Sequence, residues 1–345
     1  MRVALVSSSG RCGISEHSAQ LQAAVQAADQ DICVDWPQDN GWLDPAQYGA
    51  DPRFDLLHLN YHRGLHSRWT PEAVRNIPYP VIITFHDTYE RQPDALPWDL
   101  LALDNVKTMV VHEPCDLNFP GTITVDDGVV HHNLMQPNVL APKVHYWRQP
   151  VPLRTGEFAL PFGTFLPPGP WRPTLGTVGF DFPWKNYDLL AKVTGELGWN
   201  LRIVGQVQEE RQLALRALNP RIVFDGWVDT GYAIAALEQC DATAFLYSCA
   251  NSGTSGAIRL GIAAGRPLIA TDGCRQFRDL RGADYGIQWR TPNAEELRKW
   301  LTGYSRSAIP TLQGYDTMLL ALAEQESWVH GGRKYAELYK AAANG

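Results

Sequence analysis

The stretch from Phe245 to Asp272 constrains the fold of this chain more than any other segment. An apolar run gives way to a loop of Ser, Asn, Gly and Thr, then to small and aliphatic residues, and after Gly265-Arg266-Pro267 to a second apolar run. This order predicts a strand, a loop, a helix, a turn and another strand. Such a unit belongs to a parallel sheet whose strands are joined by helical crossovers.

The loop before the predicted helix has the composition of an anion-binding site. It offers Ser252, Gly253, Thr254, Ser255 and Gly256. Backbone N–H groups at a helix start have no partner within the helix, and the helix macrodipole is positive at that end. Glycine also lets a phosphate group approach the backbone closely. The alternative is structural, because Ser and Thr are common helix N-caps.

The alternation of strands and helices extends along the chain and predicts two domains. At 345 residues the chain exceeds what one hydrophobic core usually serves. Predicted strands are Arg2–Val6, Asp55–Leu59, Pro80–Phe85, Lys107–Val111, Leu175–Phe180, Leu201–Val204, Arg221–Phe224, Ala242–Tyr247 and Leu268–Ala270. Predicted helices are Glu16–Ala28, Tyr187–Leu197, Glu209–Leu218, Gly231–Gln239 and most of Thr317–Ala343. We therefore predict an α/β fold with Rossmann-like domains at 1–152 and 174–322, a proline-rich connection at 153–173 and a helical tail at 323–345.

Charge, cysteine usage and hydropathy exclude several classes of protein. A formal net charge of -7 argues against a protein that coats nucleic acid by charge alone, although a local basic groove would not show in the sum. The 6 cysteines are scattered without close pairs and indicate neither a zinc site nor a disulfide framework. No apolar run approaches the length of a membrane span. We predict a soluble, cytoplasmic chain with no membrane anchor of its own.

Short motifs follow one another in a fixed order along nearly the whole chain. They are Cys12–Glu16, His58–Gly64, Thr84–Asp87, Val178–Gly179, Lys185–Asn186, Leu201–Gly205, Gly226–Val228, Cys240–Ala242, Ser255–Asp272, Ser327–Trp328 and Tyr335–Tyr339. In this order and spacing they resemble the large retaining glycosyltransferase family 4, which has the GT-B architecture. The resemblance implies two Rossmann-like domains facing across a cleft, with a C-terminal helix that crosses back to the N-terminal domain.

This resemblance implies that the co-substrate is a nucleotide-diphosphate sugar, with a UDP- or GDP-sugar expected, and that no other cofactor and no metal ion is needed. The donor-binding residues that it implies are Gly13, Ile14, Gly179, Ser252, Gly253, Thr254, Ser255 and Gly256. For the loop that contains Gly13, the structural alternative is a tight turn that requires positive φ. The acceptor would be a glycan, a glycolipid or another hydroxyl compound.

Two residues match family positions that act at the reacting bond. Lys185 matches the lysine that neutralises the diphosphate as the sugar leaves, a task that suits a positive point charge. His86 matches the histidine at the end of the fourth strand, which touches the donor sugar near the reacting carbon. The structural alternatives are a solvated lysine near a helix start and a histidine that caps a strand end. One departure from the family is Phe180, which stands where arginine is usual.

A second departure lies in the loop and helix that follow Phe245. Typical family members carry two glutamates there, one holding the hydroxyls of the donor sugar and the other the ribose. This chain has Asn251 or Ser252 at the first place and Arg259 or Leu260 at the second. We expect Asn251 to hydrogen-bond sugar hydroxyls in place of the first carboxylate. We expect Arg259 to face the diphosphate.

The carboxyl ends of the N-terminal strands form the rim on which ligands bind in a parallel sheet. The acceptor-side candidates are Glu16, His62, Arg63 and Asp87. His58, His62 and His66 are spaced four residues apart, as metal ligands on one helix face would be, but His58 lies in a predicted strand. A zinc site is therefore the weaker interpretation of these histidines.

The resemblance implies front-face transfer with retention, in which the acceptor hydroxyl attacks on the side from which the diphosphate leaves. Closure of the two domains would exclude water. Three alternatives remain open. A sugar-nucleotide epimerase needs an acid/base carboxylate pair, for which the chain offers no strong candidate. A catalytically inactive nucleotide- or glycan-binding subunit fits the loss of the glutamates, and a transferase that modifies a flipped nucleic-acid base fits a stand-alone enzyme of this size.

Overall fold

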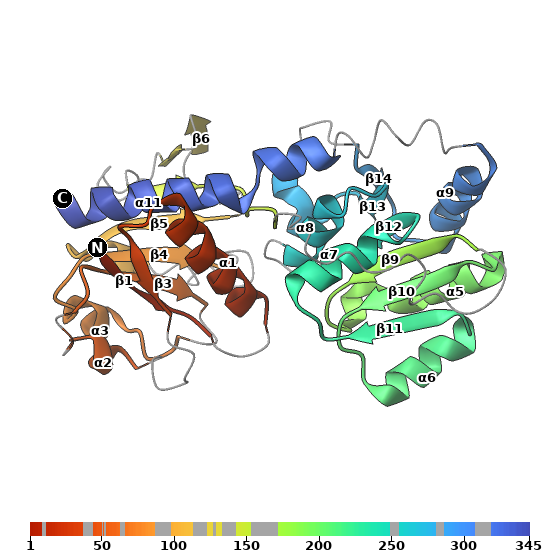
Figure 1. Ribbon diagram of the computed structural model, residues 1–345, viewed down its shortest axis with the longest axis horizontal. Helices are drawn as coiled ribbons and strands as arrows, with labels where there is room; N and C mark the ends of the chain where they lie inside the picture. The colour runs from red at the N-terminus through yellow and green to blue at the C-terminus, as the bar shows by residue number, and fades with distance from the viewer. Residues whose placement is uncertain are drawn as a thin grey trace. The chain divides into compact units, whose positions relative to one another are not determined.

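The computed structural model of the chain contains two α/β units (Figure 1). The described residues are 1–8, 12–36, 44–49, 51, 53–62, 66–86, 98–112, 123–126, 129–132, 143–152, 172–248, 255–280, 286–307 and 319–345. The first unit is formed by the described residues of 1–150 together with 328–345, and the second by those of 151–327. Among these residues, no helix is both long enough and apolar enough to cross a membrane.

The first unit is built on an eight-stranded sheet with the strand order β2-β1-β3-β4-β5-β8-β7-β6. The strands are β1 Arg2–Val6, β2 Cys33–Asp35, β3 Leu56–Tyr61, β4 Val81–Phe85, β5 Val106–Val111, β6 Ile123–Asp126, β7 Val129–His132 and β8 Val144–Tyr146. Pairing is parallel from β2 to β8, whereas β7 and β6 pair antiparallel. The parallel sheet predicted from β1, β3, β4 and β5 is confirmed. The short strands β2, β6, β7 and β8 were not predicted.

Helices cover both faces of the first sheet. On one face β1, β3, β4 and β5 pack with α2 (Pro45–Gly49), α3 (Pro71–Arg75) and α4 (Trp98–Leu101). On the other face they pack with α1 (Gly13–Ala28) and α11 (Trp328–Asn344), which lie side by side in Figure 1. The two helices meet closely at Gly332, where a Cβ atom would lie 2.4 Å from the carbonyl oxygen of Ala24. The C-terminal helix is thus part of the core of the first unit.

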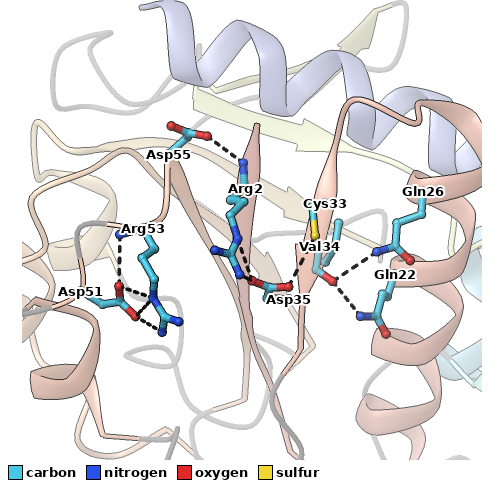
Figure 2. A network of polar contacts seen from close by, with 9 residues as sticks. All are labelled: Arg2, Gln22, Gln26, Cys33, Val34, Asp35, Asp51, Arg53 and Asp55. Carbon is cyan, nitrogen blue, oxygen red and sulfur yellow. Dashed lines mark hydrogen bonds and ion pairs between the residues drawn. The ribbon is translucent and has the colours of Figure 1, made fainter.

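Polar contacts fix the edge of the first sheet at β1 and β2 (Figure 2). The guanidinium of Arg2 donates to the Asp35 carboxylate at 2.6 Å, and the Arg2 backbone N–H donates to Asp55 at 2.7 Å. From α1, the Gln22 amide donates to the carbonyl of Val34 at 2.7 Å. These exposed pairs add little stability. The bond from Gln22 satisfies a backbone carbonyl of β2, an edge strand that would otherwise be open to pairing.

The second unit contains a six-stranded sheet, in the order β11-β10-β9-β12-β13-β14, with every pair parallel. Its strands are β9 Thr174–Val178, β10 Asn200–Val204, β11 Ile222–Gly226, β12 Ala242–Phe245, β13 Leu268–Thr271 and β14 Gln288–Arg290. The second predicted parallel sheet is confirmed, with β14 as a strand that was not predicted. Phe180 lies beyond the end of β9 rather than within it.

Alternation along the strands separates two layers of helices in the second unit. Leu201 and Ile203 of β10 pack with α5 (Tyr187–Leu197), α6 (Glu209–Leu218) and α9 (Ala294–Ser307). Val204 packs with α7 (Thr230–Glu238) and α8 (Gly256–Ala263). The predicted helices that correspond to α5 and α6 are confirmed. The predicted helix after β12 is confirmed as α8, and the strand, helix and second strand of this segment occur in the predicted order. Residues 249–254 of the predicted loop lie outside the described residues.

Candidate functional site

Three neighbouring strands of the second sheet each end in a glycine with positive φ. Gly179 follows β9 with φ of 124°, Gly205 follows β10 with φ of 146°, and Gly226 ends β11 with φ of 74°. A Cβ atom at Gly205 would lie 2.2 Å from the carbonyl oxygen of Gly179. Residues with a side chain rarely adopt such backbone conformations. The carboxyl end of this sheet, where ligands bind in such folds, therefore presents main-chain groups.

The ammonium group of Lys185 fills the space above Gly179. A Cβ atom at Gly179 would lie 1.8 Å from Nζ of Lys185 and 3.6 Å from Cβ of Ala257, which is in the first turn of α8. Nζ donates to the carbonyl of Val178 at 3.3 Å and lies 5.5 Å from the ring centroid of Tyr247. The lysine, the glycine and the start of α8 thus form one site.

A short turn holds Lys185 in this place. The lysine ends the 3₁₀ helix η4 (Pro183–Lys185), and the next residue, Asn186, has the left-handed conformation with φ of 54°. Its side-chain amide donates to the carbonyl of Leu246 at 2.6 Å, and the Ser248 N–H donates to the carbonyl of Trp184 at 2.7 Å. Both bonds tie η4 to the chain that leaves β12. The position of Lys185 is therefore fixed by neighbouring strands.

Burial lowers the pKa of the Lys185 ammonium, so that its charge can depend on whether an anion lies nearby. The residue is 8% exposed, and burial lowers the pKa of its ammonium to about 7, which Asp181 offsets only in part. Within the described part of the chain, the carbonyl of Val178 is the only hydrogen-bond acceptor for Nζ of Lys185. The nearby Asp181 carboxylate accepts instead from the guanidinium of Arg211. A group that can carry a positive charge without a paired carboxylate suits an anionic ligand.

Ser255 joins the same site through Tyr247. Ser255 is the N-cap residue of α8, but its hydroxyl caps no backbone amide there. It lies 3.4 Å from the Tyr247 hydroxyl, whose ring faces Lys185. The structure therefore brings together the predicted residues Gly179, Lys185 and Ser255, with Gly256 next in α8. Tyr247 was not predicted, since the sequence placed it at the end of a strand.

Arg259 forms a buried ion pair with Asp279 of η5 (Arg275–Leu280). Both side chains are 1% exposed. Nε and Nη1 of Arg259 have no hydrogen-bond partner among the described residues. The sequence suggested that Arg259 faces a diphosphate, whereas in the structure one side of its guanidinium is committed to Asp279. The ion pair also closes α8 onto η5.

Removing Arg259 should therefore affect folding first. We expect Arg259→Ala to lower the free energy of unfolding by about 3–5 kcal/mol, because it leaves the Asp279 carboxylate buried without its cation. Urea denaturation measures this change. The double variant Arg259→Met with Asp279→Leu should recover most of the loss, since an apolar pair of similar volume replaces the ion pair. A stable Arg259→Ala variant would show that the pair contributes little.

Three histidines meet in the first unit near the carboxyl ends of its strands, and a fourth, His58, lies within the sheet. His17 lies in α1, His58 in β3, His86 directly after β4 and His112 directly after β5. The ring centroids of His17 and His86 are 4.6 Å apart, and those of His86 and His112 are 5.7 Å apart. Burial lowers the pKa of His17 and His86 well below the usual value and that of His58 to about 3, and neighbouring histidines lower them further. The rings of His17, His58 and His86 are therefore neutral at pH 7.

Hydrogen bonds hold the ring of His58 in place. His58 bonds the Tyr339 hydroxyl at 2.6 Å through Nδ1 and the Thr84 hydroxyl at 2.7 Å through Nε2. Thr84 also bonds the Tyr335 hydroxyl at 3.0 Å. Within the described residues, no group of three His, Cys, Asp or Glu side chains is placed to hold a metal ion. His58 thus links the sheet to α11.

The other predicted residues of the first unit lie on this rim or outside the described residues. Gly13, Ile14 and Glu16 are in the first turn of α1, the helix that carries His17. His62 follows β3, and its backbone N–H donates to Nδ1 of His66 at 3.0 Å. Residues outside the described part are Arg63, Asp87, Asn251, Ser252, Gly253 and Thr254. His17 and Asn60 were not predicted as site residues, although His17 lies close to Gly13 in the sequence.

Comparison with known proteins agrees with this geometry. Residues 172–301 match the family described as "Glycosyl transferases group 1". A sequence search of curated proteins finds no match. Similar solved structures include Anabaena HepE in complex with UDP and glucose, with 13% identity, 99% of each chain covered and a TM-score of 0.65.

Two further structures resemble the chain over its whole length. Sucrose-phosphate synthase from Thermosynechococcus elongatus has 16% identity and a TM-score of 0.66, with 99% of this chain and 98% of that chain covered. WaaG, a glycosyltransferase involved in lipopolysaccharide biosynthesis, has 12% identity and a TM-score of 0.59, with 98% of this chain and 99% of that chain covered. The fold is that of the GT-B glycosyltransferases, as the motifs predicted. Within this fold, residues 172–301 are similar to the group 1 glycosyltransferases.

Proposed function

We propose that the chain is a retaining glycosyltransferase of the family 4 type, which transfers a sugar from a nucleotide-diphosphate sugar to an acceptor hydroxyl without a metal ion. The observation that carries this proposal is the site made by Lys185, Gly179 and the start of α8. It combines a buried amine, unhindered main-chain groups and a helix N-terminus, which together suit a diphosphate. The complex of HepE with UDP-glucose favours UDP as the nucleotide.

The proposed chemistry requires charge stabilisation at the leaving group. The bond from the anomeric carbon to the diphosphate breaks, and the acceptor oxygen forms its bond to that carbon on the same face. The acceptor proton passes to a phosphate oxygen. Lys185 in its charged form and the N–H groups at the start of α8 would stabilise the negative charge that develops on the diphosphate. His86 and Asn251 are proposed to hold hydroxyls of the donor sugar.

A catalytically inactive nucleotide-binding subunit is the second candidate. Phe180 favours it, because its ring stacks on Trp227 with centroids 5.2 Å apart at the strand edge where the family usually has an arginine. Arg259 is paired with Asp279, so neither position supplies a free cation beside Lys185 in the described structure. Such a subunit would bind a nucleotide sugar but would form no product.

Thermal-shift screening with UDP, GDP, ADP, CDP and their sugars tests the proposed function. A ligand that binds only the folded chain raises the melting temperature by mass action. We expect a nucleoside diphosphate and its sugar to raise Tm, with UDP favoured. Release of the free nucleotide from the selected sugar nucleotide, measured with candidate acceptors, then separates an enzyme from an inactive subunit. The absence of a shift with every nucleotide would contradict both candidates.

Gly179→Ala should disrupt the site directly. The new methyl group would occupy the space of Lys185 Nζ, and φ of 124° disfavours any side chain. We expect a loss of at least about tenfold in affinity for the selected nucleotide, equivalent to one lost charged hydrogen bond, and a loss of about 1–3 kcal/mol in the free energy of unfolding. Calorimetric titration and urea denaturation measure the two effects.

Gly198→Ala is the matched control for backbone strain. Gly198 ends α5 with φ of 72°, and a Cβ atom there would approach only Arg172, at 3.3 Å. This variant should lose stability while it keeps its nucleotide affinity. If Gly179→Ala bound the nucleotide as tightly as Gly198→Ala, the space above Gly179 would have no part in binding.

A further inference from the structure

A chain of hydrogen bonds runs from a backbone carbonyl to His86. Nδ1 of His112 lies 2.9 Å from the carbonyl oxygen of Trp147, and Nε2 of His112 lies 3.1 Å from Nε2 of His17. Nδ1 of His17 lies 3.2 Å from Nδ2 of Asn60. Oδ1 of Asn60 lies 2.5 Å from Nε2 of His86. The members come from α1, β3 and the residues that follow β4, β5 and β8 (Figure 1).

The carbonyl of Trp147, at one end of this series of hydrogen bonds, fixes which atom donates in the next two bonds. The oxygen of Trp147 can only accept, so Nδ1 of His112 carries a proton. In a neutral ring Nε2 of His112 is then bare and accepts from Nε2–H of His17. This leaves Nδ1 of His17 bare, and it accepts from the amide of Asn60. Burial keeps His17 in the neutral form by lowering its pKa well below the usual value.

The orientation of the Asn60 side chain independently gives the same assignment of donors and acceptors. Its Nδ2 atom also donates to the hydroxyl of Ser18 at 2.6 Å, so both amide protons point toward Ser18 and His17. Oδ1 must then face His86, and an amide oxygen can only accept. The proton of His86 is therefore on Nε2, and Nδ1 carries a lone pair. Among the described residues, none is a hydrogen-bond partner of His86 Nδ1.

We propose that Asn60 is a positioning residue that holds His86 in the neutral tautomer with its proton on Nε2, so that Nδ1 accepts a hydrogen bond from a hydroxyl of the donor sugar. A ring in this state cannot donate a proton from Nδ1, so it orients a hydroxyl and cannot act as an acid. That the hydroxyl belongs to a donor sugar rests on the proposed function. The assignment of the His86 tautomer does not rest on the proposed function.

The arrangement also opposes protonation of each ring. A second proton on His17 Nδ1 would face the amide protons of Asn60, and one on His112 Nε2 would face the proton of His17. Among the described residues, the titratable groups that interact with His86 are histidines, namely His17, His58, His62, His66 and His112. The pKa of His86 is lowered well below the usual value by burial first and then by these neighbours.

Nitrogen NMR of the full chain tests the tautomer without any ligand. Two-bond proton–nitrogen correlations of the histidine rings at pH 7.5 distinguish protonated from bare nitrogens, and His86→Gln assigns the His86 signals by their loss. We expect a protonated Nε2 and a bare Nδ1 for His86, and the same pattern for His17. A protonated Nδ1 or a charged ring at His86 would overturn the proposal even if no Asn60 variant folds.

Asn60→Asp tests the positioning role. A carboxylate accepts from His86 but cannot donate to His17, so the pKa of His86 should rise toward or above its usual value of about 6.5. The tautomer of His17 should also change. At a pH below this raised pKa, Nδ1 of His86 carries a proton and no longer accepts. Asn60→Asp should then weaken binding of the selected nucleotide sugar by about tenfold, the size of one hydrogen bond, and leave binding of its nucleoside diphosphate unchanged.

Each outcome distinguishes this proposal from the proposed function. Equal losses for the sugar nucleotide and the nucleoside diphosphate would show that Asn60 only supports the fold. Unchanged His86 and His17 signals in Asn60→Asp would remove Asn60 from the control of the tautomer. If no nucleotide binds even the wild-type chain, the proposed function fails together with the donor-sugar assignment, whereas the NMR result still decides the tautomer.

Discussion

Replacing Lys185 with methionine is expected to abolish nucleotide-sugar transfer while it raises, rather than lowers, the stability of the fold. Burial lowers the pKa of Lys185 to about 7 from its ordinary value of 10.5. Between these values the unfolded chain binds one more proton than the folded chain, so the buried amine costs stability, and that cost shrinks as pH rises toward 10.5. Methionine removes this cost and keeps the volume of the side chain. Loss of the cation should lower kcat by about 10²-fold or more.

Two measurements check the Lys185→Met variant. Turnover of the selected nucleotide sugar should be lost, and Tm at pH 7.5 should equal or exceed that of the wild type. Lys192→Met is the control, because Lys192 is an exposed lysine of the adjacent helix α5. It should change neither quantity. A Lys185→Met variant that retains full turnover would exclude Lys185 from the mechanism.

Mild acid is expected to unfold the first unit through its buried histidines. In the unfolded chain a histidine has its ordinary pKa of 6.5, whereas the pKa of His58 falls to about 3 and those of His17 and His86 also lie well below the usual value. Below pH 6.5 the unfolded chain therefore binds more protons. The free energy of unfolding should fall by up to about 4 kcal/mol per pH unit for three such rings, which is large against a typical total of about 5–15 kcal/mol.

Urea denaturation between pH 7.5 and pH 5 measures this dependence. Hydrogen exchange of peptides from β3, β4 and α11 shows whether the first unit is the part that opens. His58→Gln should reduce the slope by about 1.4 kcal/mol per pH unit, since one ring no longer titrates. Stability that is independent of pH in this range would contradict the neutral buried cluster.

The parts of the site that follow from strand order could be predicted from the sequence. Lys185 and Ser255 are 70 residues apart in the chain numbering, but each follows a strand of one parallel sheet, and the carboxyl ends of such strands share an edge. The glycines that end β9, β10 and β11 are visible in the same way. Periodicity also predicted α5 and α6, whose apolar residues recur at helical spacing.

The hydrogen bonds of the histidine cluster could not be predicted, because they depend on contacts between distant segments. Tyr335 and Tyr339 belong to a motif of the predicted helical tail, and nothing in the sequence indicates that their hydroxyls bond Thr84 and His58 of the first sheet. Likewise, nothing local to Arg259 indicates that Asp279, in a separate segment, is its partner. Side-chain pairing across a fold is set by tertiary packing, which periodicity does not encode.

The central claim is that a diphosphate binds beside Lys185 at the carboxyl end of the second sheet. Calorimetric titration of the selected nucleoside diphosphate, in buffers of different ionisation enthalpy at pH 8, tests it most directly, because bound phosphate should return the lysine to its charged form. We expect the wild type to take up close to one proton per nucleotide, and Lys185→Gln to bind at least about tenfold more weakly with no proton uptake. Equal affinity and equal proton uptake in the two proteins would contradict the claim.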